Sequence, residues 1–257
     1  MKRIFSIFSL CLLALLFFSC SGAMQLQKSI NSYTTALGYV YDSPVSACPR
    51  SDSMVVIYNG LDLNNLTTVS KARVKLFPFL FVNYFEKNFR VKLGQNLMEQ
   101  DYNDFFFDAF LDESDRSGCY ALRYDSTYSD SVYTLEITLD TCETNSKYRQ
   151  SSLMLYFIYA YSISYSEKGL PAETRLAFTA RLKKGRTLIS EKRYSIRKSL
   201  PFMRSGQDGT NGLRADFVYN MVQSLNLGTK DCVEAIVRDV NASIGSGRFS
   251  NLPASSK

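Results

Sequence analysis

The sequence predicts an α+β fold, a single antiparallel sheet with helices packed on one face. Several segments alternate apolar and polar residues with a period of two, as half-buried strands do. One segment near residue 100 is strongly amphipathic at the helical period, and two further segments near the C-terminus share that period. A run of strands accompanied by separate helices is typical of the α+β class.

The first half of the domain contains a strand, two apolar stretches and a helix. A short strand is expected at Met54–Tyr58, closed by turn residues Asn59-Gly60. Residues 61–71 are interpreted as a polar loop, and residues 72–93 hold two apolar stretches with strand character. Asn96 and Glu99 have the spacing of a capping box, so the helix is expected to begin there.

The second half is expected to contain five strands and two helices. The segment 153–165 is long and apolar, but seven of its thirteen residues are aromatic or β-branched, which favours a strand. Gly228 separates the two C-terminal helical segments and is predicted to stop the first. The other strands are expected at 119–124, 133–139, 176–182 and 187–198, with a hairpin turn at 183–186 and a loop at 199–214.

Composition restricts the possible chemistry. There is no histidine, which excludes Ser-His-Asp and Cys-His catalysis and His-ligated metals. No phosphate-binding loop, nucleophile elbow or zinc signature is present, so the sequence predicts no cofactor and no metal. Without residues 1–19 the chain has 28 basic and 24 acidic residues, a net charge of about +4 that does not indicate nucleic-acid binding.

The N-terminus has the layout of an export signal. Lys2 and Arg3 precede an apolar run over 4–18, which ends in Ser19 and Cys20. This segment resembles the lipobox of bacterial lipoproteins, although Phe17 and Phe18 depart from its preferred residues. The resemblance implies a signal peptide at 1–19 and a lipid, including palmitate-type chains, on Cys20.

Two other interpretations of the N-terminus remain open. Ser21-Gly22-Ala23 would suit an ordinary secretory peptidase, which would release a soluble protein from Met24. Alternatively, residues 4–18 could remain as an anchor, but they are shorter than the ~20 residues of a membrane span. After Cys20 we expect an irregular tether over 20–52, a globular domain over 53–245 and a flexible tail over 246–257.

The cysteines fit an exported protein. Four remain after the signal and Cys20 are set aside, and an even number in an oxidising compartment predicts disulfides. We expect a hairpin that brings Cys119 opposite Cys142, which leaves Cys48 and Cys232 paired with each other or both free.

Two charge features are candidates for function. Residues 99–115 hold seven acids and no base, with Asp101, Asp104, Asp108 and Asp112 along one helix face. Paired carboxylates can hydrolyse glycosides, but a solvated helix face gives the same spacing. Residues 167–198 carry ten bases and three acids, and the turn residues Lys183, Lys184 and Arg186 are candidates for contact with an anionic membrane surface. The alternative is that these bases keep an exposed sheet soluble.

The element order after a lipobox-like Cys20 is similar to that of lipopolysaccharide-assembly lipoproteins and of auxiliary lipoproteins of ABC-type exporters. This resemblance implies a non-enzymatic accessory or binding protein of a bacterial cell-envelope complex, anchored by its lipid and facing the periplasm. Ser21 is typical of sorting to the outer rather than the inner membrane in such lipoproteins. The implied partners are the membrane and an unidentified envelope protein. The alternative is a secreted or anchored hydrolase that uses paired Asp and Glu carboxylates.

Overall fold

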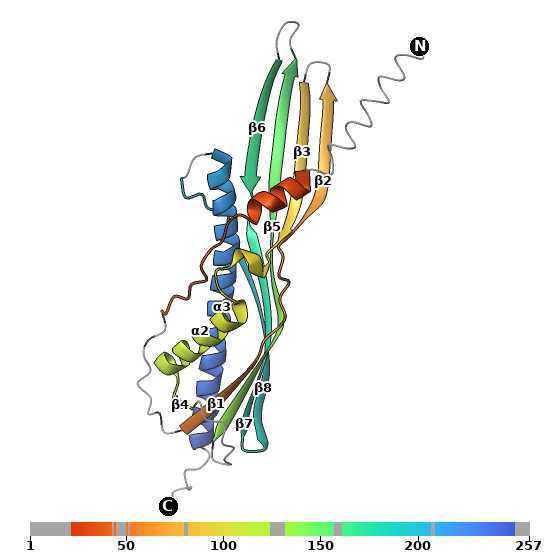
Figure 1. Ribbon diagram of the computed structural model, residues 1–257. Helices are drawn as coiled ribbons and strands as arrows, with labels where there is room; N and C mark the ends of the chain where they lie inside the picture. The colour runs from red at the N-terminus through yellow and green to blue at the C-terminus, as the bar shows by residue number, and fades with distance from the viewer. Residues whose placement is uncertain are drawn as a thin grey trace, which may run out of the picture.

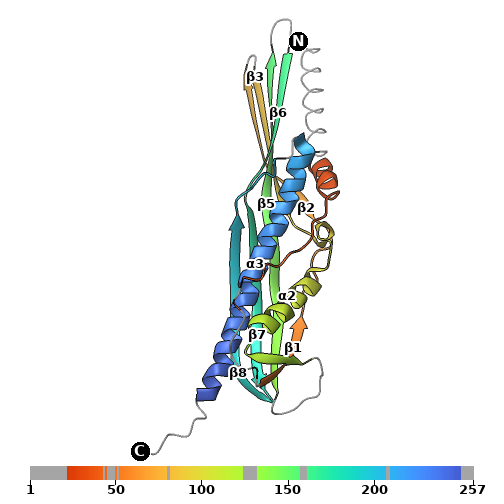
Figure 2. The ribbon, with the colours of Figure 1, turned by 90° about the vertical axis from the view of Figure 1, so that its left-hand side faces the viewer.

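The structure, a computed structural model, describes residues 22–42, 44, 50, 52–79, 82–123, 132–156, 161–206 and 209–249. Within these residues the protein has one eight-stranded, mostly antiparallel sheet, and helices α2 and α3 lie on one of its faces (Figures 1 and 2). The prediction of an α+β fold is confirmed. The molecule is elongated, with the sheet running along its whole length.

Strand β5 (Tyr133–Tyr156) joins the two ends of the sheet. Its first half lies between β1 (Asp52–Asn59), which is parallel to it, and β7 (Ala172–Lys184), which is antiparallel. Its second half lies between β3 (Val82–Lys92) and β6 (Tyr161–Gly169), both antiparallel. The expected strand at 133–139 is therefore only the beginning of a much longer one.

The remaining strands lie at the edges of the sheet. β2 (Thr68–Phe79) pairs with β3, and β8 (Thr187–Leu200) pairs with β7. The short β4 (Tyr120–Arg123) is parallel to β1, which separates it from β5. The predicted hairpin turn between β7 and β8 is confirmed, and Gly185 takes a φ of 54° there. That left-handed conformation suits a glycine, which has no Cβ.

Two hairpins, β2–β3 and β5–β6, project beyond the helices at one end of the molecule (Figure 1). We call their outer strand segments, residues 76–79, 82–85, 151–156 and 161–166, the blade. In the blade the four strands lie in the order β2, β3, β5, β6, so β2 and β6 form its outer edges. The predicted strand at 153–165 is found as the end of β5 and the start of β6, while residues 157–160 lie outside the described residues.

Helix α2 (Tyr102–Ser117) begins later than predicted. Asp101 caps it, because its side chain accepts a hydrogen bond from the Asn103 backbone N–H at 2.8 Å. Asn96 instead lies in the 3₁₀ helix η1 (Gln95–Leu97), and its side-chain oxygen accepts bonds from the Thr67 backbone N–H at 2.7 Å and the Thr67 hydroxyl at 2.9 Å. The expected cap at Asn96 is therefore wrong, since its side chain holds the preceding loop.

Helix α3 (Gly209–Phe249) is one continuous helix of 41 residues, so the prediction of two helices separated at Gly228 is wrong. A Cβ atom at Gly228 would meet Leu176 Cδ1 and Thr174 Cγ2 of β7, each at 3.3 Å. The glycine therefore allows the helix to approach the sheet closely. α3 also includes 209–214 and 246–249, which were expected to be a loop and a tail; residues 250–257 lie outside the described residues.

The expected irregular tether over 20–52 is wrong for its first part. Residues 22–30 are helical, and Leu26 and Ile30, on one face of this helix, are 2% and 0% exposed. Leu37 is also buried, and the Gln27 side chain donates to the Thr67 backbone oxygen at 3.0 Å. Leu26 and Ile30 are four residues apart, so they lie on the same side of this short helix and pack it against the core. The polar residues around them hide this helical pattern in the sequence.

The core lies between the sheet and the two long helices. Phe106 of α2 stacks on Phe178 of β7 with ring centroids 4.4 Å apart, and Phe217 of α3 meets Tyr148 of β5 edge-on at 5.1 Å. The Tyr102 and Thr229 hydroxyls join the two helices at 2.9 Å. None of the helices within the described ranges is both long and apolar enough to cross a bilayer.

The two glycines of α3 at positions 228 and 245 provide a matched test of this packing. A Cβ at Gly245 would meet nothing within 4 Å, so Gly245→Ala should raise the free energy of unfolding by up to about 1 kcal/mol through helix propensity alone. Gly228→Ala should give no gain, because its Cβ contacts the sheet. Urea unfolding would compare the two variants, and equal gains would contradict close packing at Gly228.

Candidate functional site

Cys20, the predicted lipidation site, lies outside the described residues. Gly22, only two residues later, lies beside β3 close to the blade. A Cβ atom built there would be 3.2 Å from Lys87 Nζ and 3.8 Å from Phe89 Cζ. The described chain therefore begins at the end of the molecule from which the two hairpins project (Figure 1).

A buried ionic cluster lies at the base of the blade. Arg214 of α3 donates to both carboxylate oxygens of Glu167 of β6, at 2.7 and 3.1 Å. Gln150 of β5 donates to the same carboxylate at 2.9 Å, and the Tyr148 and Tyr165 hydroxyls also donate to it. The Glu167 side chain is only 1% exposed. This bidentate pair joins the first turns of α3 to the blade.

The cluster also holds the N-terminal helix. Arg214 Nη1 donates to the Ser29 hydroxyl at 2.9 Å. Burial alone would raise the pKa of Glu167, but the hydrogen bonds from Arg214, Tyr148 and Tyr165 outweigh it and lower that pKa. The carboxylate therefore stays charged in the folded protein. Sequence reasoning missed this cluster, because its members are far apart in the chain and only the fold brings them together.

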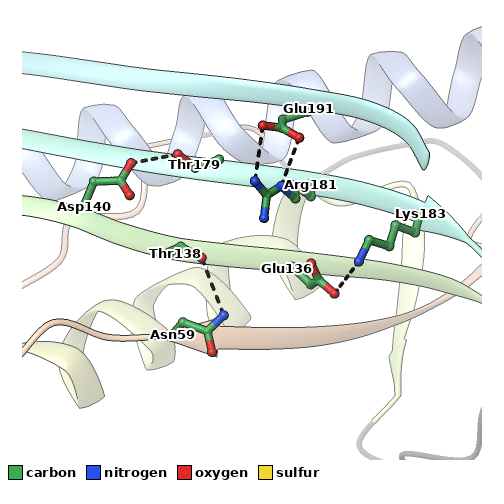
Figure 3. Close-up of polar contacts among 8 residues, drawn as sticks. All are labelled: Asn59, Glu136, Thr138, Asp140, Thr179, Arg181, Lys183 and Glu191. Atoms are coloured by element: carbon green, nitrogen blue, oxygen red, sulfur yellow. Dashed lines mark hydrogen bonds and ion pairs between the residues drawn. The ribbon is translucent and has the colours of Figure 1, made fainter.

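The basic region 167–198 is largely neutralised by ion pairs on the outer face of the sheet (Figure 3). Lys183 Nζ lies 2.6 Å from Glu136 Oε1, and Arg181 Nε lies 2.9 Å from Glu191 Oε2. Lys184 Nζ lies 4.7 Å from the centroid of the Tyr133 ring. Arg186 is exposed at the turn. Glu136, the acid that pairs with Lys183, lies on β5 and therefore outside residues 167–198. These ion pairs favour a role of the basic residues in keeping the sheet soluble over a role in binding anions.

Several acids of α2 and its cap take part in structural contacts. Asp101 caps the helix, and Asp112 accepts a hydrogen bond from the Tyr41 hydroxyl at 2.8 Å. Asp115 is paired with Arg50 at 2.9 Å. The contacts of Tyr41 and Arg50 show that the chain preceding β1 returns over part of this face.

Two hollows bring acids of different elements near one another, as the hydrolase alternative requires. One, of about 220 Å³, is lined by Asp62, Asp140 and Glu143, and is smaller than the ~300–1,000 Å³ of usual ligand pockets. The other, of about 640 Å³, is lined by Glu143 and Glu173. Lys92 lies 2.8 Å from Glu143.

Glu173 does not suit the role of the protonated acid that glycoside hydrolysis needs. Hydrogen bonds from Arg197 and Arg175 lower the pKa of Glu173, which keeps it ionised. The ammonium group of Lys92 neutralises Glu143.

The predicted disulfide between Cys119 and Cys142 is wrong. Cys142 and Cys232 are free thiols, whereas Cys119 is disulfide-bonded. The expected hairpin does not form, because β1 lies between β4 and β5 and separates the segments of Cys119 and Cys142. Cys48 lies outside the described residues, and its predicted pairing with Cys232 is excluded by the free thiol of Cys232.

Burial raises the pKa of both free thiols. It raises the pKa of Cys142 to about 12, and it also raises the pKa of Cys232, a fully buried residue of α3. Because the thiolate is the reactive form, neither residue is prepared to act as a nucleophile. In the described ranges no three side chains of the metal-binding types come together.

Comparison with known proteins gives a structural likeness. No family model matches the chain, and no curated protein matches it. The crystal structure of protein XCC0632 from Xanthomonas campestris, family-model DUF330, aligns over 84% of this chain and 98% of its own, with 13% identity and a TM-score of 0.41. A likeness at this level carries no inference about function.

Replacing Glu167 should test the ionic cluster. Glu167→Gln should lower the free energy of unfolding by about 3 kcal/mol at neutral pH, because it leaves the partly buried Arg214 without its anion. The matched change Glu191→Gln, in a solvent-exposed pair, should lower the free energy of unfolding much less. Urea unfolding would measure both.

The pH dependence provides a second criterion. The folded pKa of Glu167 is lowered from 4.5, so its stabilisation is present above that pH and is lost as the pH falls through the folded value. The difference between wild type and Glu167→Gln should therefore shrink in acid. A difference that stays constant from neutral pH to about pH 3 would contradict this account.

The thiols give a further prediction. In the native protein Cys142 and Cys232 should resist alkylation, and both should react after unfolding without a reductant. Cys119 should react only after reduction. Peptide mapping by mass spectrometry would read each site, and Cys119 labelled before reduction would refute its disulfide.

Proposed function

We propose that the protein is a non-enzymatic lipoprotein of the bacterial cell envelope, anchored by a lipid on Cys20. Its folded body would face the periplasm and act as an accessory or binding component of an envelope complex. Ser21 favours the outer membrane as its location. The proposal is supported first by the basic, apolar and small-residue order of the first twenty residues.

The position of Gly22 is the structural observation that carries the proposal. Two residues extend at most about 7 Å, so a lipid on Cys20 would hold the body directly at the membrane. Gly22 lies beside Lys87, and the helix that follows is buried through Leu26 and Ile30. Such an anchor would fix the orientation of the body relative to the bilayer, which a long flexible linker would not do.

The chemistry of the hollows supports a non-enzymatic role over the hydrolase alternative. The glutamates that meet there, Glu143 and Glu173, are each paired with a base. The two free thiols have raised pKa values. The described surface is instead rich in ion pairs and exposed apolar side chains, which suit binding.

Metabolic labelling with a fatty-acid probe tests the anchor. Wild type should be labelled and Cys20→Ala should not, because only the cysteine of a lipobox-like signal receives the lipid. Cys142→Ala is the control and should be labelled like the wild type, since that thiol lies inside the fold. Equal labelling of wild type and Cys20→Ala would refute lipidation at this position.

A further inference from the structure

We propose that the blade enters the lipid bilayer, so that the protein is held by its two apolar hairpins as well as by its N-terminus. This inference rests in part on the proposed lipid anchor, because that anchor fixes which end of the molecule faces the membrane. The other observations come from the blade itself: where its charges end, what covers it and which side chains lie at its base.

The charged residues of the four strands end within two register positions of one another, at Lys75, Glu86, Arg149 and Glu167. Lys75 pairs with Glu86, which is next to Ser151 and, across it, Ser166. Towards the body, the next level holds Lys87 and Glu167. Towards the tips there is no Asp, Glu, Lys or Arg at positions 76–85 or 150–166. A shared limit across segments some 70 residues apart in sequence is expected where a sheet passes from water into hydrocarbon.

The blade exposes apolar side chains on both of its faces. Phe77 and Leu76 of β2, neighbours that point to opposite faces, are 65% and 52% exposed. Ile163 and Tyr165 of β6 are 55% and 53% exposed. Helices α2 and α3 cover the sheet only below this level (Figures 1 and 2). Apolar patches of this kind mark interaction sites, since a soluble sheet normally carries a polar outer face.

The β7–β8 hairpin at the opposite end of the molecule shows how the same chain builds a hairpin for water. Its turn contains Lys184, Gly185 and Arg186. By contrast, the sequences that link the blade strands, Leu80-Phe81 and residues 157–160, are apolar or aromatic throughout. These links lie outside the described residues. Turns in water favour Gly, Asn, Asp and Ser instead.

Tyrosines lie at the boundary between the charged and charge-free levels. The Tyr84 hydroxyl donates to Glu86 at 2.7 Å, and the Tyr165 hydroxyl donates to Glu167. Each tyrosine belongs to the blade, while its hydroxyl group is bonded to an acid on the body side. Tyrosine is enriched at membrane–water interfaces because its ring is apolar and its hydroxyl is polar.

The position of the N-terminus favours lipid as the partner that surrounds the blade. Gly22 lies beside Lys87, just below the level at which charges end, and Cys20 is two residues earlier. A lipid on Cys20 would therefore enter the bilayer where the blade begins. The described blade strands have four to six residues each, or about 14–20 Å at 3.4 Å per residue. That length matches one leaflet of a hydrocarbon core about 30 Å thick.

Tryptophan fluorescence can test the proposal, because the chain has no tryptophan of its own. Phe77→Trp would place one in the blade, and Leu188→Trp would place one at a similarly exposed position of β8, 51% exposed, near the opposite end. Each variant of the full chain, with Cys20 intact or as Cys20→Ala, would be reconstituted with vesicles of phosphatidylethanolamine and phosphatidylglycerol, with or without brominated acyl chains.

The Phe77→Trp emission should shift to the blue and be quenched by brominated acyl chains, whereas the Leu188→Trp emission should change little. In the Cys20→Ala background, where no lipid anchors the chain, Phe77→Asp combined with Ile163→Asp should lower flotation with vesicles at least about tenfold. Leu188→Asp should not lower it. Circular dichroism would confirm folding of each variant, and the tryptophan result remains decisive if the aspartate variants fail to fold.

The outcomes separate this inference from the proposed function. Quenching of Phe77→Trp in a chain that mass spectrometry shows to be unacylated would support the blade and refute the anchor. An acylated, vesicle-bound protein without quenching would overturn the blade and leave the anchor intact. A blue shift that grows with protein concentration without vesicles, together with no bromine quenching, would show that a second copy covers the blade and would also overturn it.

Discussion

The continuity of strand β5 is the constraint on which the rest of the structure depends. Four strands pair with it directly, β1 and β7 along its first half and β3 and β6 along its second. The first half is covered by helices and lies over the core, while the second half carries the blade. The register with β7 shifts between Leu139 and Thr141, so Asp140 is an extra, unpaired residue; such a bulge lets a strand bend, and the ladder resumes at Thr141.

The buried pair of Glu167 and Arg214 lies where the two-layer part of the molecule ends. Below it, α3 packs on the sheet through apolar side chains such as Phe217. Above it, the sheet continues as a single layer. A bidentate ion pair is directional, whereas apolar packing is not, so this cluster fixes the angle at which α3 and the N-terminal helix meet the base of the blade.

Periodicity in the sequence was sufficient to predict the fold class and most of the strands. Alternating segments such as 176–182 and the charged turn at 183–186 depend on local patterns, and local patterns are visible without a structure. The start of α2 was misplaced because both Asn96 and Asp101 are good capping residues, and only the loop around Thr67 decides between them.

The features that sequence reasoning missed depend on contacts between distant segments. Gly228 has the composition of a helix stop, but it lies in a close helix–sheet contact that no local signal reveals. β1 lies between β5 and β4, so Cys119 does not lie opposite Cys142, its predicted partner. The blade could be predicted only in part. The two runs without charged residues can be recognised in the sequence, but the sequence does not show that they align next to Glu86 and Glu167 or that no helix covers them.

The open edges of the blade have an energetic consequence. β2 and β6 each pair on one side only, so every second residue along their outer sides presents its backbone N–H and C=O groups to the surroundings. Water satisfies those groups at no net loss, but hydrocarbon cannot, and each unpaired group there costs several kcal/mol. The depth that a lone copy can reach is therefore limited by its backbone rather than by its side chains. Edge-to-edge pairing between neighbouring copies would remove that limit, which couples the depth of the blade to the density of the protein in the membrane.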